Sequence, residues 1–159
     1  MNDKHPVAYI AEPTIDDIKR SAVALVWSLR ENLGVIERLL HWDSKDVGPQ
    51  MIEQICDNGG LALGSMLVCR HAGAGFDVEQ LLHIANLHCK TAVSHLENHF
   101  AYAALLSRPQ GNQQDRLTEL GTNERLYACR SSQMGRQAAH RALAKLVESW
   151  PDSYRREDD

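Results

Sequence analysis

The residues most able to bind a metal or move a proton lie together in residues 77–107, a stretch without Pro or Gly. They are His83, His88, Cys89, His95 and His99. A stretch of this length and composition predicts one long helix. On such a helix, His95 and His99 lie one turn apart, so their two rings could chelate a single cation.

A complete ligand set for that cation is not apparent. His88 lies seven residues before His95, about 10 Å along a helix, whereas metal ligands lie about 2 Å from the ion. The chain contains neither the Glu-x-x-His motif of di-iron bundles nor the His-Glu-x-x-His motif of zinc proteases. We therefore expect no metal or other cofactor. A metal site at His95 and His99 is kept as the second alternative.

Patterns of covalent catalysis or phosphate binding are also missing from the sequence. Ser65 lacks the Gly-x-Ser-x-Gly pattern of a nucleophile elbow, and the glycine-containing residues 71–75 lack the Lys-Ser/Thr of a phosphate loop. The cysteines have no metal-ligand spacing and predict buried free thiols; they are Cys56, Cys69, Cys89 and Cys129. We therefore predict that the protein is not an enzyme.

A group of basic residues lies nearer the C-terminus. Residues 108–150 carry seven bases and four acids, in a chain whose formal net charge is −4. At helical spacing, Arg130, Arg141 and Lys145 form a narrow positive strip. Such a strip suits a protein partner. A nucleic acid is the alternative, although a dedicated nucleic-acid binder is usually far more basic.

Trp27 is the aromatic residue best placed to anchor a partner. It lies away from the main apolar stripe of residues 15–40, and Val23 lies one turn earlier on the same side. Two apolar residues outside the core predict an interface with another protein or with a second copy of the chain. The alternative is that the N-terminal segment covers Trp27 through residues 7–10.

Four apolar series at helical spacing predict the elements that carry these residues. They cover residues 14–42, 49–70, 77–107 and 115–150. Thr14 and Asp17 form a capping-box pattern at the start of the first series, and Asp77 is expected to cap the third. Because no strand-like alternation occurs, the predicted fold is all-α, an antiparallel bundle of four long helical regions.

Two glycine positions could interrupt these helices. Gly59-Gly60 belongs to a strong turn signal, and Gly121-Thr122 falls inside the fourth region. Because the apolar series continues across Gly59-Gly60, we expect residues 49–70 to form one helix with a weak point there. An interruption at Gly121-Thr122 is left open. In the fourth region, an apolar seam that includes Tyr127 and Met134 is expected to be buried.

The predicted domain organisation is simple. Residues 1–13 form an N-terminal arm, residues 14–150 form a single helical-bundle domain, and residues 151–159 form a charged flexible tail. The longest apolar run, residues 61–68, is too short to span a bilayer, so we expect no membrane partner. The N-terminus lacks an apolar signal core, and the expected localisation is cytoplasmic.

A helical domain without an acid, base, nucleophile or ligand set more often supplies a binding surface than chemistry. We therefore predict a non-enzymatic adaptor or regulator, a bacterial-type accessory or inhibitor protein, that binds another protein and could also form a homodimer. The residues expected at the interface are Val23, Trp27, Arg130, Arg141 and Lys145. The first alternative is a nucleic-acid-binding regulator that uses the basic C-terminal helix.

Overall fold

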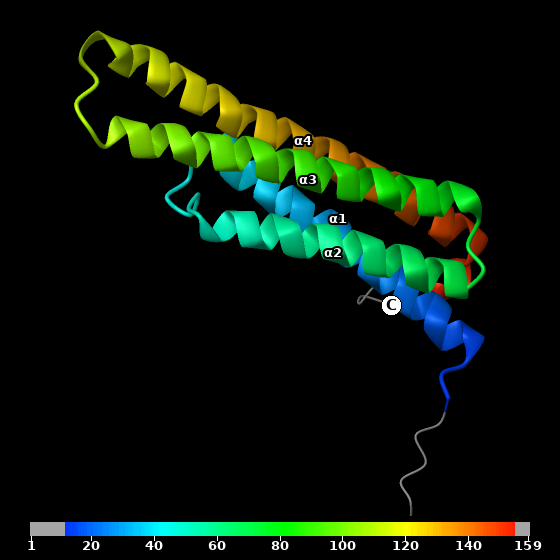
Figure 1. The fold of residues 1–159 in the computed structure, drawn as a ribbon. Coiled ribbons are helices and arrows are strands. Elements are labelled where there is room, and N and C mark those ends of the chain that lie inside the picture. The colour runs from blue at the N-terminus through cyan, green and yellow to red at the C-terminus, as the bar shows by residue number, and fades with distance from the viewer. Residues whose placement is uncertain (1–11, 155–159) are drawn as a thin grey trace, which may run out of the picture.

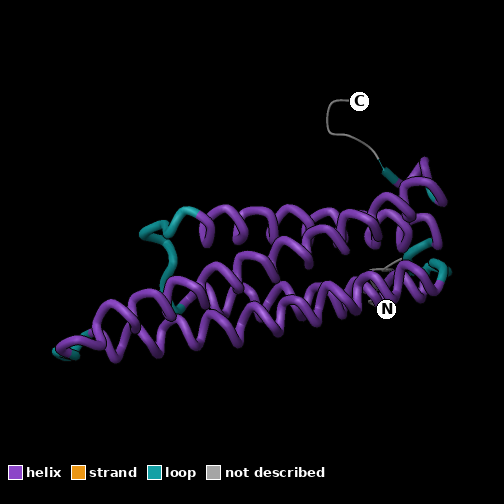
Figure 2. Tube along the Cα trace, turned by 90° about the horizontal axis from the view of Figure 1, so that it is seen from above, coloured by secondary structure: helices purple, strands orange, loops and turns teal. Residues whose placement is uncertain are grey.

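The computed structural model describes residues 12–154, which fold into four helices joined by short connections (Figure 1). The helices are α1 (Ile15–His41), α2 (Gln50–His71), α3 (Phe76–Leu106) and α4 (Gln114–Ser149). Two short 3-10 helices flank α4, namely η1 (Gly111–Gln113) and η2 (Pro151–Ser153). Consecutive long helices run in opposite directions, and residues 12–154 contain no strand (Figure 2). The predicted all-α antiparallel bundle is confirmed.

Helices α1 and α3 begin in different ways. At α1, the backbone N–H of Asp17 donates to Oγ1 of Thr14 at 3.2 Å, and the N–H of Thr14 donates to Oδ2 of Asp17 at 3.1 Å. Each side chain thus satisfies a donor that would otherwise lack a partner. At α3, the N-cap is Gly75 and no side chain caps the helix, so the predicted cap at Asp77 is wrong. Asp77 lies in the first turn instead, where its negative charge interacts favourably with the positive end of the helix dipole.

Helices α2 and α4 continue through both glycine positions. The expected single helix at Gly59-Gly60 is therefore confirmed, and the interruption left open at Gly121-Thr122 does not occur. A Cβ atom at Gly59 would lie 3.1 Å from Oδ1 of Asn86, and one at Gly121 would lie 3.3 Å from Cβ of Tyr102. Both neighbours belong to α3. These glycines therefore let α2 and α4 approach α3 closely, and the packing gained there offsets the low helix propensity of glycine.

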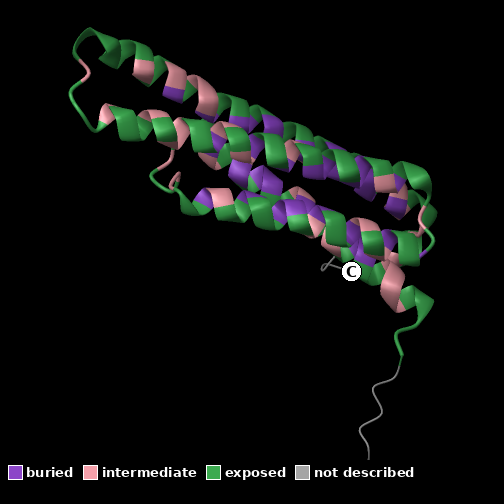
Figure 3. Ribbon diagram, viewed as in Figure 1, coloured by how far each residue is buried: buried purple, intermediate pink, exposed green. Residues whose placement is uncertain are grey.

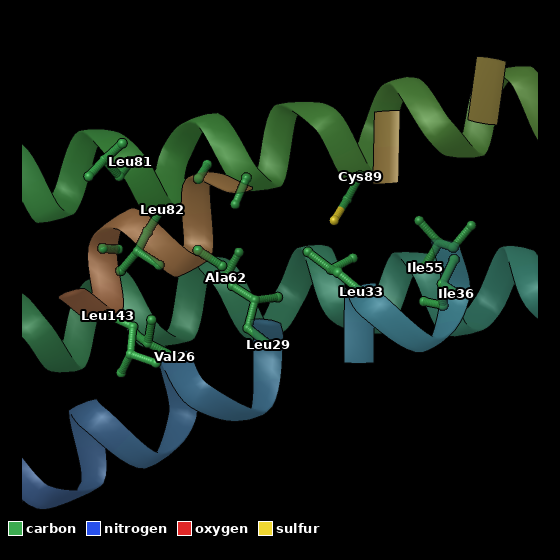
Figure 4. Close-up of a cluster of buried hydrophobic side chains, with 14 of the residues drawn as sticks. Val26, Leu29, Leu33, Ile36, Ile55, Ala62, Leu81, Leu82, Cys89 and Leu143 are labelled. Carbon is green, nitrogen blue, oxygen red and sulfur yellow. The ribbon is translucent and has the colours of Figure 1, made fainter. Parts of the chain in front are cut away.

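One apolar core runs along the inside of the bundle (Figure 3). Helix α1 contributes large side chains such as Leu29 and Leu33, whereas α4 contributes many small ones such as Ala139 and Ala142. Figure 4 shows side chains from all four helices meeting in this core, among them Val26, Ala62, Leu82 and Leu143. The small residues of α4 bring its backbone close to its neighbours.

The folded unit continues past Trp150. Trp150 and Tyr154 pack against the core on either side of η2, and Nζ of Lys19 lies 5.4 Å from the centre of the Trp150 ring, within range of a cation–π contact. Residues 151–154 therefore belong to the bundle rather than to a tail. The rest of the expected tail, and residues 1–11 of the expected arm, lie outside the described residues.

The helices do not all touch one another. Helices α3 and α4 are the longest and form the most extensive contact, and together they project beyond α1 and α2 (Figure 1). Within residues 12–154, α2 contacts α1 and α3 but not α4. Helices α2 and α4 thus occupy opposite corners of the bundle. None of the described helices is long and apolar enough to cross a membrane.

Candidate protein-binding surface

Helix α4 presents a row of side chains on the side that faces away from the core. This row, the α4 stripe, consists of Tyr127, Arg130, Met134, Arg141 and Lys145. The intervals of three, four, seven and four residues keep the row on one side of a helix. Tyr127 is 50% exposed and Met134 is 42% exposed. The α4 stripe therefore combines exposed apolar groups with positive charge.

The prediction that Tyr127 and Met134 are buried is wrong. The buried face of α4 lies further round the helix and is built from small residues, among them Ala128, Ser132, Gly135 and Ala139. A Cβ atom at Gly135 would lie 3.3 Å from Cδ1 of Leu33 and 3.5 Å from Cβ of His88. At this separation the core has no room for a phenol ring or a thioether chain. Close packing therefore buries the row of small residues and leaves Tyr127 and Met134 outside.

Arg125 marks the edge of that buried face and has a structural role that the sequence does not reveal. Its side chain is buried, and Nη1 donates to the backbone carbonyls of Leu40 and, at 3.3 Å, His41. These carbonyls belong to the last turn of α1, where no intrahelical N–H reaches them. Nε of Arg125 also lies 3.5 Å from Oδ1 of Asp43. Arg125 thus caps α1 from α4.

The arginines of α4 differ in whether an acid neutralises them. Nε of Arg136 lies 2.6 Å from Oε2 of Glu37. Lys145 reaches Asp77 only at 3.5 Å. Within residues 12–154, Arg130 and Arg141 form no ion pair. Two guanidinium groups on the α4 stripe are therefore available to an acidic partner.

Trp27 and Val23 are not equivalent. Trp27 is 43% exposed, but Val23 is only 3% exposed and belongs to the core, so its assignment to an interface is wrong. Val23 lies on the flank of α1 that α4 covers, the same flank where Nη1 of Arg30 lies 3.3 Å from Nδ1 of His140. The sequence reveals the main stripe of α1 but not this second buried flank. Residues 7–10, the alternative cover for Trp27, lie outside the described residues.

Trp27 and the α4 stripe do not form one surface. The stripe lies on the side of α4 nearer to α3, as the approach of Lys145 to Asp77 shows. Trp27 lies on α1, three residues before Arg30, which faces the opposite side of α4. The predicted interface residues are therefore split between two sides of α4.

His95 and His99 both turn toward α4. Nδ1 of His95 lies 2.5 Å from Oε2 of Glu124, and Nδ1 of His99 lies 2.6 Å from the carbonyl oxygen of Gly121. The carbonyl of Gly121 can only accept, so His99 donates from Nδ1. Chelation by this pair would have to use the two Nε2 atoms. No group of three or more His, Cys, Asp or Glu side chains within residues 12–154 is arranged to hold a metal ion.

The cysteines divide into one exposed and three buried thiols. Cys56 is exposed, whereas Cys69, Cys89 and Cys129 are buried, and all four are free. Burial raises the pKa of Cys69 and of Cys89 to about 12, and burial also raises the pKa of Cys129. Protonated thiols are poor nucleophiles. The three buried cysteines therefore act as packing residues.

Comparisons with protein-family models, with curated proteins and with solved structures find no match for this chain.

Proposed function

We propose that this protein is a non-enzymatic adaptor or regulator that binds an acidic protein segment through the α4 stripe. The observation that carries this proposal is the exposure of Tyr127 and Met134 beside Arg130 and Arg141, two arginines without an ion pair in residues 12–154. Tyrosine, methionine and arginine are enriched at protein interfaces. The Tyr127 ring packs against the His95 ring of α3, with the ring centroids 5.3 Å apart, yet half of Tyr127 and 42% of Met134 stay exposed and open to a partner.

The chemistry of the stripe favours a partner helix that carries both apolar and acidic residues. Tyr127 and Met134 offer apolar contacts two turns apart, and Arg130 lies between them. A partner with apolar residues at intervals of three or four, interspersed with Asp or Glu, would match this order. Electrostatic complementarity of this kind mainly raises the association rate and the specificity.

Nucleic acid remains the alternative ligand for the same surface. Three bases on the stripe would neutralise few phosphates, and the stripe also carries two exposed aromatic or apolar groups that a phosphate backbone would leave unused. We expect binding to duplex DNA to be weak, with a shallow dependence on salt concentration. Tight binding at physiological salt with a steep salt dependence would favour the nucleic-acid alternative.

Trp27 is a second candidate anchor, on the other side of α4. Its exposure is consistent with this role, and tryptophan is common among residues that dominate binding energy. We also propose that the protein works in the cytoplasm, a reducing compartment, because its four cysteines are free thiols.

The test is a quantitative affinity capture with three variants of the full chain. Arg130→Glu/Arg141→Glu should lose the proteins that wild type retains, whereas Arg38→Glu, an exposed arginine on α1, should retain them. Trp27→Ala reports on the second anchor. Circular dichroism checks that each variant stays helical. If the double variant retains every wild-type partner, the α4 stripe is not the binding surface.

A further inference from the structure

The outer side of α2 carries an apolar surface that nothing else in residues 12–154 covers. This surface, the α2 face, consists of Cys56, Gly60, Leu63, Gly64 and Leu67, all of which are exposed. Leu63 is 38% exposed and Leu67 is 57% exposed. From residue 58 to residue 69, α2 contains no charged side chain. A water-facing surface of this length without charge calls for an explanation.

Packing among residues 12–154 does not explain the two glycines of the α2 face. A Cβ atom at Gly60 or at Gly64 would meet no heavy atom within 4 Å, in contrast to Gly59, where Oδ1 of Asn86 lies close. Glycine in a helix interior lowers helix stability. Gly60 and Gly64 therefore weaken α2 without serving any close approach within residues 12–154.

We propose that the α2 face binds the α2 face of a second copy of the chain, with the two helices antiparallel. The register follows from size complementarity. When Leu63 lies opposite Gly64 of the partner subunit, Gly60 lies opposite Leu67 of the partner subunit. Each leucine then fills the space above a glycine, and the two-fold axis repeats the contact. Such an interface is isologous, the commonest kind in homodimers.

The charges at the ends of α2 support the antiparallel direction. Glu53 and Asp57 lie in its N-terminal half, and Arg70 and His71 lie in its last turn. Antiparallel pairing places the acidic end of one helix beside the basic end of the other, whereas parallel pairing would bring like charges together. Nε of Arg70 already contacts Glu79 at 2.9 Å, yet the Arg70 side chain is 59% exposed and remains accessible to a second acid.

This dimer is independent of the proposed partner binding. Helix α2 does not contact α4 among the described residues, and the two lie at opposite corners of the bundle (Figure 1). Pairing through α2 therefore leaves the α4 stripe of each copy free. Because a single pair of helices makes a small interface, we expect a dissociation constant in the micromolar range.

The first experiment is sedimentation equilibrium of the full chain under reducing conditions, over the micromolar range. Wild type should form a dimer, and Gly64→Gln should raise the dissociation constant at least about tenfold because the added side chain separates the helices. The control is Ala101→Gln, an exposed position on α3, which should dimerise like wild type. A monomer throughout for wild type, or unchanged dimerisation of Gly64→Gln, would overturn the proposal.

A charge cycle tests the direction of pairing. Asp57→Lys and His71→Glu should each weaken the dimer, because each places like charges near one another across the interface. The combined variant Asp57→Lys/His71→Glu should recover part of the affinity, since the two new charges then attract each other across the interface. Both positions are exposed. Weakening by each single variant without recovery in the double variant would count against antiparallel pairing.

Disulfide trapping tests the register itself, in a Cys56→Ser background. In the proposed register the two copies of residue 63 are offset by about 1.5 Å along the helices, and the two copies of residue 67 by about 10 Å. Leu63→Cys should therefore form a disulfide dimer on oxidation and Leu67→Cys should not. Equal trapping at both positions would indicate parallel helices, and trapping at position 67 alone would indicate another register; either result would overturn the proposal.

Discussion

At the scale of single residues, Arg125 is the one charged residue that is buried within residues 12–154. Its guanidinium joins α4 to the last turn of α1 across 85 positions in the sequence. The residue is nearly as buried as the core leucines around it, with 7% of its surface exposed. Removing it would leave the carbonyls of α1 without a donor and open a cavity beside them.

We therefore expect Arg125→Ala to lower the free energy of unfolding by about 2 to 4 kcal/mol. Urea denaturation followed by circular dichroism measures this change. Arg130→Ala, an exposed arginine on the same helix, is the matched control and should change stability by less than about 0.5 kcal/mol. Similar effects of the two substitutions would mean that the cap contributes little.

The buried thiols make stability depend on alkaline pH. Burial raises the pKa of Cys69 and Cys89 to about 12, whereas an unfolded thiol titrates near pH 8.5. The unfolded chain therefore loses these protons at a lower pH than the folded chain. The contribution of the buried thiols to the free energy of unfolding is complete below about pH 8.5 and falls as the pH rises toward 12, by at most about 1.4 kcal/mol per pH unit for each thiol. Urea denaturation across this pH range should show that the free energy of unfolding of Cys69→Ala/Cys89→Ala falls less steeply than that of wild type.

Thiol accessibility gives a simpler test of the same burial. At neutral pH a thiol reagent should modify Cys56 rapidly, and the three buried cysteines should react only as the chain unfolds. Absorbance of the released product counts the reactive thiols, with urea-unfolded protein as the reference for all four. Rapid reaction of more than one thiol would show that the bundle opens readily.

At the scale of the helix, the sequence predicts the number and type of elements well and their contact faces less well. The start of α1 at Thr14 can be recognised in the sequence because a capping box acts locally. The buried face of α4 could not be predicted in this way, because two adjacent rows of residues on the helix are both candidates for burial. Only the distance from α4 to α1 and α3 decides which row is buried. Arg125 added to the difficulty, because a buried arginine looks like a surface residue in a sequence.

The glycines of α2 show the same dependence on neighbours and allow a direct prediction. Gly60→Ala and Gly64→Ala should each stabilise the chain by up to about 1 kcal/mol in dilute solution, because their Cβ atoms meet nothing. Gly59→Ala should gain less or lose stability, since its Cβ would press on Asn86. Thermal denaturation of the three variants at low protein concentration, where the chain is monomeric, distinguishes these outcomes. Equal gains at all three positions would contradict the packing at Gly59.

At the scale of the whole molecule, the proposed dimer has a distinctive shape. Antiparallel pairing through α2 sets two bundles side by side, with an α4 stripe on each outer side. Small-angle X-ray scattering should show the mass doubling with concentration while the cross-section grows more than the length. Gly64→Gln at the same concentrations should keep the scattering of a single bundle. An end-to-end particle would rule out the α2 face as the contact.

Two outward stripes would make the dimer bivalent. A surface coated densely with the partner would then hold the wild-type dimer longer than the Gly64→Gln monomer, although each stripe binds with the same affinity. Biosensor dissociation rates at high and low partner density measure this difference. Equal rates for both proteins at high density would show that the two stripes do not act together.

Because α1 packs against α4, its second buried flank stays bare while the ribosome is still making the rest of the chain. Helix α1 ends at residue 41 and α4 ends at residue 149, an interval that takes about 5 to 20 s to translate. Throughout that time Val23 has no cover from α4, and the carbonyls that Arg125 caps face water. Nascent chains stalled before residue 114 should therefore be cut readily by trypsin at Arg20 and Arg30, and should gain protection only once α4 has emerged.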